Sequence, residues 1–312
     1  MTPLNDTIRS ALTWSTTALP GDPSAGSVAL RHAEVVGPTD GPTVTITCGV
    51  HGDEGPWGAL AVQRVLERPL VELRGRLRLV FAANPTSVAA DTRGSPLDHL
   101  DLNRCFPGAE SGSHSERLAA VLARIVAGSD VLIDLHGGGS WCVNAFAFRF
   151  PGSEDLANAV GAPFVVDMAI RTGNLAGHVS AAGTRVVAIE MGGRSVDELL
   201  WRDRLGDGVE RVLGVAESLP RRLSEPEPST PVTDLSVVRP SIGGVLVPAV
   251  RQDAIGTVVP KDTLLGVVHD LHTMEPSESL TAPFDRTALL LIRPHVAVLE
   301  GGAMTYVVGR PG

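Results

Sequence analysis

Hydrophobic positions in the first two-thirds of the chain form short runs that alternate with amphipathic stretches. The runs are rich in Val, Ile and Phe and end at turn residues, which is typical of β-strands. We expect strands at residues 44–50, 77–83, 131–135, 145–150, 164–167 and 186–190. We expect helices at 58–67, at 115–126 with a cap at Ser113 or Ser115, and from Ser195 onward. This alternation predicts a layered α/β domain with a parallel or mixed central sheet.

The pattern changes near residue 220. Residues 220–234 are rich in Pro, Ser and charged side chains, which is typical of a linker. Short β-like runs follow, punctuated by Gly and Pro and with no convincing helix, at 242–250, 256–268 and 287–308. We therefore predict a catalytic domain over 1–222 and a small all-β domain, sandwich- or barrel-like, over 231–312.

Composition and charge narrow the class of protein. The chain has 312 residues, 43 % of them hydrophobic and 20 % charged, an ordinary globular mixture that excludes general disorder. No apolar run reaches the roughly 18 residues of a membrane span, and no signal peptide is expected. The net charge of −9 argues against nucleic-acid and anionic-membrane partners. Three cysteines, Cys48, Cys105 and Cys142, are typical of reduced thiols in a cytoplasmic protein.

Reactive side chains stand where predicted strands end. His51 follows the first strand, His136 follows the third, and Glu190 closes the last. Ligands of open α/β sheets bind at the carboxyl ends of the strands. If these strands share a sheet, His51, Glu54, His136 and Glu190 converge on one crevice.

His51 and Glu54 have a spacing that suits a metal. Residues three apart on a helical turn point the same way, and imidazole and carboxylate both bind zinc. With His136 they would supply three ligands and leave the fourth position open for water. Nine His and 35 acidic residues in 312 give roughly one such pair by chance, so a solvated loop remains the alternative.

A set of motifs occurs in order along the chain, from Gly41 to Gly193. It comprises Gly49-Val50-His51-Gly52-Asp53-Glu54, Asn84-Pro85, Arg93, Asp101-Leu102-Asn103-Arg104, Asp134-Leu135-His136 and Glu190-Met191-Gly192-Gly193. The set resembles the succinylglutamate desuccinylase/aspartoacylase family of the zinc carboxypeptidase clan. Residues 93–98 and the DLNRCFPG stretch most resemble the branch that holds N-acetyl-diaminobutyrate deacetylases. The resemblance implies a three-layer α/β/α domain with a mixed central sheet.

The resemblance also implies a role for each matching residue. His51, Glu54 and His136 would bind one zinc ion per chain. Glu190 would be the general base and acid, and Arg93 would polarise the scissile carbonyl and hold the developing oxyanion. These roles suit the chemistry, because a carboxylate can carry a proton and a guanidinium stays charged.

Asn103 and Arg104 would grip the carboxylate of the substrate. The implied activity is deacylation of a small N-acyl amino acid or diamino acid, by a protein that could form a homo-oligomer. Two alternatives remain: a zinc metallocarboxypeptidase acting on short peptides, and an inactive ligand-binding homologue. The resemblance further places the C-terminal domain beside the mouth of the site.

Other candidates are left open. Asp134 could accept a hydrogen bond from the second ring nitrogen of His136, or it could be a buried strand residue with another partner. The Gly137–Gly139 run is expected to give the backbone room beside the metal. His178 and Arg171 are possible substrate contacts, whereas His99 is expected in a solvated loop.

Overall fold

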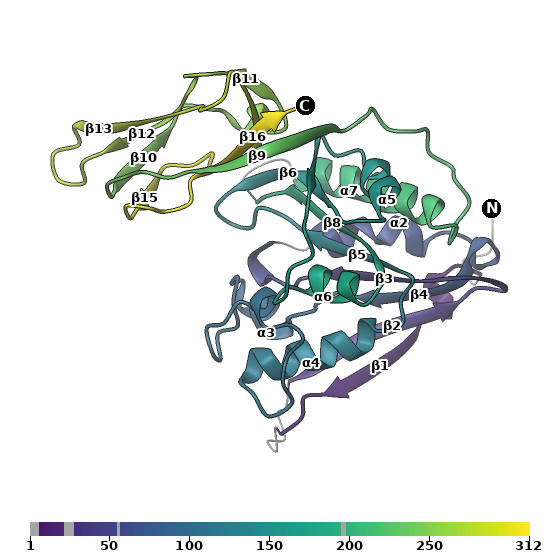
Figure 1. Ribbon diagram of the computed structural model, residues 1–312. Helices are drawn as coiled ribbons and strands as arrows, with labels where there is room; N and C mark the ends of the chain where they lie inside the picture. The colour runs from purple at the N-terminus through teal and green to yellow at the C-terminus, as the bar shows by residue number, and fades with distance from the viewer. Residues whose placement is uncertain (1–5, 22–27, 55–56, 195–197) are drawn as a thin grey trace.

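The computed structural model describes residues 6–21, 28–54, 57–194 and 198–312 (Figure 1). The first part of the chain contains the strands β1 (Thr13–Ala18), β2 (Ala29–Val36), β3 (Thr39–Cys48), β4 (Arg74–Val80), β5 (Val131–His136), β6 (Val143–Arg149), β7 (Phe164–Asp167) and β8 (Arg185–Gly192). Its helices are α1 (Trp57–Ala61), α2 (Gln63–Leu66), α3 (Pro85–Ala90), α4 (His114–Val126), α5 (Glu154–Ala159), α6 (Leu175–Ala181) and α7 (Glu198–Val215).

All six strands expected from the sequence are present, as β3 to β8. The helix expected at 58–67 is divided into α1 and α2, and Ser113 caps α4 in a capping box with Glu116. The predicted helix start at Ser195 lies outside the described residues. The sequence patterns missed β1, whose side chains are mostly exposed, and the short helices α3, α5 and α6. They also missed β2, in which Arg31, His32 and Glu34 interrupt the apolar run. Exposed or short elements leave too little apolar periodicity to detect.

The central sheet is mixed. The strands β4, β3, β5 and β8 run parallel, while β2 pairs antiparallel with β4 and β6 antiparallel with β8. Helices α4 and α6 cover one face, and α1, α2, α5 and α7 cover the other (Figure 1). Neighbouring residues of β5 alternate between these layers: Leu132 packs toward α4 and α6, and Ile133 toward α7. The three-layer arrangement predicted for this part is thus confirmed.

The rest of the chain is all-β, as expected. It contains β9 (Thr230–Val238), β10 (Gly244–Pro248), β11 (Val258–Pro260), β12 (Leu264–His269), β13 (Pro276–Thr281), β14 (Arg286–Ile292), β15 (Ala297–Leu299) and β16 (Tyr306–Pro311). The order β13-β12-β10-β15 forms a separate antiparallel sheet, which projects away from the helical layers (Figure 1). Within this region the buried Tyr306 hydroxyl donates to the carbonyl of Leu265 at 2.8 Å.

The other four C-terminal strands extend the central sheet. Strands β9, β16, β14 and β11 follow β7 in its order, and β14 also pairs with β6. Because β9 begins at Thr230, the last residues of the expected linker are strand rather than coil. The domain boundary near residue 222 stays a prediction. In the part of the chain that the structure describes, no helix is long and apolar enough to cross a membrane.

Candidate active site

One face of the central sheet forms the floor of the site. His136 on β5 pairs with Glu190 on β8, which pairs with Phe146 on β6. Paired residues point to the same side of a sheet, so these three side chains form a row. Ala188 and Phe148 belong to the preceding row, on the same face. The strand ends thus bring His136 and Glu190 together, as expected from the sequence.

The turn after β3 brings His51 and Glu54 to this row. The chain leaves β3 at Gly49, whose φ of 68° favours glycine, and continues into the 3-10 turn η2 (Gly52–Glu54). A Cβ on Gly52 would lie 2.0 Å from the carbonyl oxygen of Ser87. The backbone therefore approaches this closely only because residue 52 has no side chain.

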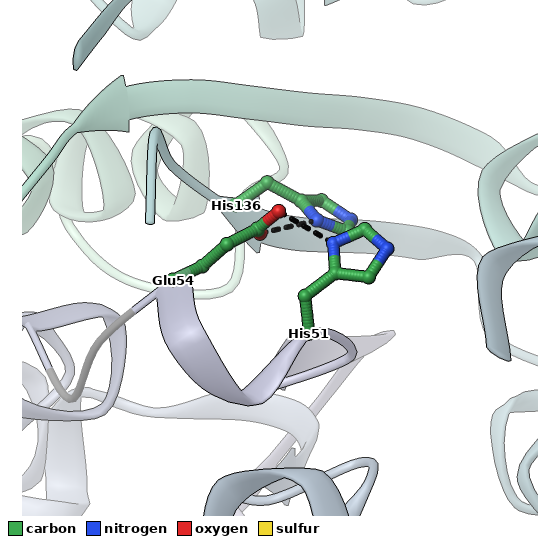
Figure 2. Close-up of side chains that lie close together, drawn as sticks. All are labelled: His51, Glu54 and His136. Carbon is green, nitrogen blue, oxygen red and sulfur yellow. Dashed lines mark hydrogen bonds and ion pairs between the residues drawn. The ribbon is translucent and has the colours of Figure 1, made fainter. Parts of the chain in front are cut away.

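The carboxylate of Glu54 lies between two imidazoles (Figure 2). Its Oε1 is 2.5 Å from Nδ1 of His51, and its Oε2 is 2.9 Å from Nδ1 of His136. All three residues are buried, and their ligand atoms lie within 4.8 Å of one another. Among the described residues this is a buried cluster with the donors that a metal ion requires.

The outer nitrogen of each imidazole is held by an aspartate. Nε2 of His51 lies 3.0 Å from Oδ1 of Asp101, and Nε2 of His136 lies 3.0 Å from Oδ2 of Asp134. Carboxylates that hold the second nitrogen of a histidine orient its ring and make it a better ligand. The donor set and its supports therefore fit a divalent metal. Asp134 takes the first of its two expected roles, and it also accepts from the hydroxyl of Thr47 at 2.6 Å.

The ionisable groups of the cluster shift one another's pKa values. Burial alone would raise the pKa of Glu54, but the nearby His51 and His136 outweigh it and hold that pKa well below its usual range. Burial alone would lower the pKa of His136, but Asp134 and Glu54 raise it well above its usual value. A metal would compete with protons for these ligands, so metal affinity should fall as the pH falls.

A cavity of about 360 Å³ opens beside the cluster. Its lining combines polar and charged side chains with the apolar side chains of Phe148, Phe150 and Met168. Glu190 faces this cavity, where burial raises its pKa to about 7 although the nearby His136 acts to lower it. A carboxyl group with such a pKa can accept and donate a proton near neutral pH.

Arg93, Asn103 and Arg104 also line the cavity. Arg93 is held by two carboxylates, donating to Oε1 of Glu54 and Oδ2 of Asp101, each at 3.2 Å. The amide oxygen of Asn103 accepts from the backbone N–H of Leu175 at 2.9 Å. Its amide nitrogen is the atom left to serve as a donor.

Arg104 is exposed, and its guanidinium donates to the backbone carbonyl of Asn103 at 2.7 Å. All seven residues singled out from the sequence therefore lie at the cluster or along the cavity wall. The roles assigned to them stay predictions.

Sequence reasoning missed other residues of the site. Asp101 holds both His51 and Arg93, yet only its place in the DLNR motif marked it. Asn144 donates to Oε2 of Glu190 at 2.8 Å, and no motif marked it at all. Arg171, which the sequence left undecided, lines the cavity.

The Gly137–Gly139 run does provide room for the backbone. A Cβ on Gly138 would lie 2.1 Å from the carbonyl oxygen of Cys142, and Gly139 has a φ of 64°. His99 is exposed, as expected for its loop. His178 stacks on Phe106, with ring centroids 6.4 Å apart, and does not line the described cavity.

Comparison with known proteins identifies the class. Residues 40–213 match the model of the succinylglutamate desuccinylase/aspartoacylase catalytic domain, which is more than half of the chain. The chain belongs to this family and is a hydrolase with a buried His–Glu–His metal-site candidate.

Individual relatives agree with this assignment. An N-alpha-acetyl-L-2,4-diaminobutyric acid deacetylase from Halomonas elongata is 40 % identical over 120 residues, which are 38 % of this chain and 35 % of that protein. The match thus spans about a third of the relative's length. The product-bound ectoine utilization protein EutE (DoeB) from Ruegeria pomeroyi has a TM-score of 0.83 at 25 % identity, covering 98 % of this chain and 96 % of that one. A succinylglutamate desuccinylase from a Silicibacter species shares the fold, with a TM-score of 0.82 at 22 % identity over 99 % and 97 % of the two chains.

The metal-site geometry predicts which substitution removes the metal. We expect His136→Ala to lose most of its bound zinc after dialysis, because it deletes one of three ligands. We expect Asp134→Asn to weaken zinc affinity about 10- to 100-fold, because a neutral amide replaces the carboxylate that supports the ring while all three ligands remain. Metal content is measured by mass spectrometry, with circular dichroism to check folding. His99→Ala, an exposed histidine, is the matched control and should keep its metal, whereas full zinc retention in His136→Ala would contradict the site.

Proposed function

We propose that this chain is a zinc-dependent deacylase that hydrolyses the amide bond of a small N-acyl amino acid or N-acyl diamino acid. The observation that carries the proposal is the placement of Glu190 and three arginines around one cavity beside the His51–Glu54–His136 cluster. The activity named for the Halomonas relative is of the same kind.

The metal and the acid–base group have distinct tasks. Zinc bound by His51, Glu54 and His136 would lower the pKa of a water molecule to about 7 and polarise an amide carbonyl. Glu190 accepts the proton of the attacking water and then donates it to the departing amine. Arg93 donates hydrogen bonds to the carbonyl oxygen as negative charge develops there. The products are a carboxylic acid and a free amine.

The charges along the cavity favour an anionic substrate. Arg93, Arg104 and Arg171 line it, although the chain as a whole carries a net charge of −9. The acids in the lining are Asp134 and Glu190, both of which already have hydrogen-bond partners. Arg104 and the free amide nitrogen of Asn103 can bind the substrate carboxylate, and the aromatic wall can take the acyl group or the side chain.

The volume of the cavity also supports a small substrate. About 360 Å³ lies at the low end of the range for small-molecule pockets. A metallocarboxypeptidase would use the same zinc and arginine chemistry on a peptide, so substrate size separates the two activities.

A substrate screen tests the proposal directly. We expect the zinc-loaded protein to release amine from N-acetyl, N-succinyl or N-formyl amino acids, including Nα-acetyl-L-2,4-diaminobutyrate, and to leave short peptides intact. Chelation should abolish turnover and added zinc should restore it. Turnover of peptides alone would favour the carboxypeptidase, and no turnover with full zinc content would favour an inactive binding protein.

Glu190→Gln tests the proton transfer. The amide is nearly isosteric but cannot carry the proton, so kcat should fall about 10²- to 10⁴-fold while zinc content stays near normal. A base works in its ionised form, so wild-type activity should rise with pH through the pKa of Glu190. Bound zinc would lower that pKa from about 7, since a cation stabilises the carboxylate. This rising limb should be absent from the residual rate of the variant, and a kcat above about a tenth of wild type would require another base.

Arg104→Lys tests the grip on the substrate. Lysine keeps the charge but loses the planar fork that binds a carboxylate through two hydrogen bonds. We expect KM to rise with a smaller change in kcat, because the carboxylate is held in both ground and transition states. Steady-state kinetics on an N-acyl amino acid measure both constants, with exposed Arg239→Lys as the control. An unchanged KM would show that Arg104 binds something else.

A further inference from the structure

The carboxylate of Glu190 is held from one side. Its Oε2 accepts a hydrogen bond of 2.8 Å from the amide nitrogen of Asn144, a residue that is only 4 % exposed. Among the described residues, Oε1 has no such partner. One oxygen is thus fixed against the sheet, and the other is left to the cavity.

We propose that Asn144 is a positioning residue that holds Glu190 in the orientation needed for proton transfer. A glutamate has three rotatable side-chain bonds, and confining it increases the fraction of molecules with the carboxylate in place. The amide suits this task, because it donates a hydrogen bond without taking or giving a proton itself. The inference rests on the role proposed for Glu190.

The register of the sheet explains why Asn144 reaches Glu190. Phe146 pairs directly with Glu190, and Asn144 stands two residues earlier on β6, so it lies diagonally across on the same face. Asn144 itself pairs with Gly192 on β8 and with Leu291 on β14. Strands on both sides therefore fix its backbone.

Strand β14, in the C-terminal part of the chain, pairs with the segment of β6 that carries Asn144. Leu291 and Ile292 of β14 pair with Asn144 and Val143 of β6, and the next residue, Arg293, lies over the ring of Trp141 at 4.4 Å from its centroid. All lining residues of the described cavity fall between His51 and Glu190. The C-terminal strands thus act here on the backbone that carries Asn144 rather than on the wall of the cavity.

Two variants of Asn144 test the proposal, assayed with Nα-acetyl-L-2,4-diaminobutyrate or the fastest substrate of the screen. Asn144→Ala removes the donor, and Asn144→Leu removes it while filling the space. In both we expect kcat to fall roughly 10- to 100-fold, the range for a hydrogen bond to a charged group. We expect KM to stay within about threefold and zinc content to be unchanged, because substrate and metal contacts remain.

A matched control separates positioning from general packing. Thr45→Val removes another buried hydrogen bond of this sheet, between Thr45 and Ser129 at 2.6 Å, three residues before the end of β3. It should lower the melting temperature without lowering kcat. An equal fall of kcat in Thr45→Val would show that loss of packing suffices, and would overturn the proposal.

The Glu190→Gln background gives the decisive comparison. If Asn144 acts through Glu190, adding Asn144→Ala to Glu190→Gln should change the residual rate by less than about threefold. The same fold loss in both backgrounds would overturn the positioning role. Normal kcat in both Asn144 variants, with a strong loss in Glu190→Gln, would overturn it and leave the proposed function standing. High activity of Glu190→Gln would instead refute the role of Glu190, and with it this inference.

Discussion

Burial of the Glu54 carboxylate is the constraint around which the site is built. Only 8 % of this residue is exposed, and an ionised carboxylate removed from water is costly unless it is paired. His51, His136 and Arg93 all contact it, and Asp101 and Asp134 stand behind the two imidazoles. Nitrogen groups and carboxylates therefore alternate outward from Glu54. Removing one partner of such a set is expected to be more damaging than its exposure alone would indicate.

The strands of the sheet hold His136 and Glu190 in fixed positions. His136 and Glu190 are cross-strand partners, so their separation is set by the backbone of β5 and β8 rather than by loops. His51 and Glu54 come from a turn that lies tightly against Ser87, and Arg93 and Asp101 come from the loop after α3. Sites carried by strands hold their geometry well, which suits the acid–base role that we propose for Glu190 beside the metal ligand His136.

The sequence predicted the site residues that lie at the ends of apolar strands. His51, His136 and Glu190 each close an apolar run, and the motif order extended that reading to Arg93 and to the DLNR segment. Asn144 could not be predicted in this way, because its contact with Glu190 joins residues 46 positions apart. That contact exists only because β6 lies antiparallel beside β8. The hydrophobic periodicity of a segment predicts a strand but does not predict which strand lies beside it. The same holds for β14, whose pairing with β6 joins parts of the chain that the pattern separated into two domains.

The pairing of β14 with β6 also provides hydrogen-bond partners for an edge of β6 that β7 does not cover. Strand β7 pairs with β6 only from Phe146 onward, which leaves that edge of Val143 and Asn144 without a partner from β7. Unpaired backbone groups beside the cavity would have to be solvated, since buried N–H and C=O groups need hydrogen bonds. Leu291 and Ile292 pair with this edge and are themselves buried. A strand that does not line the cavity therefore completes the backbone pairing of Asn144, the residue that donates a hydrogen bond to Glu190.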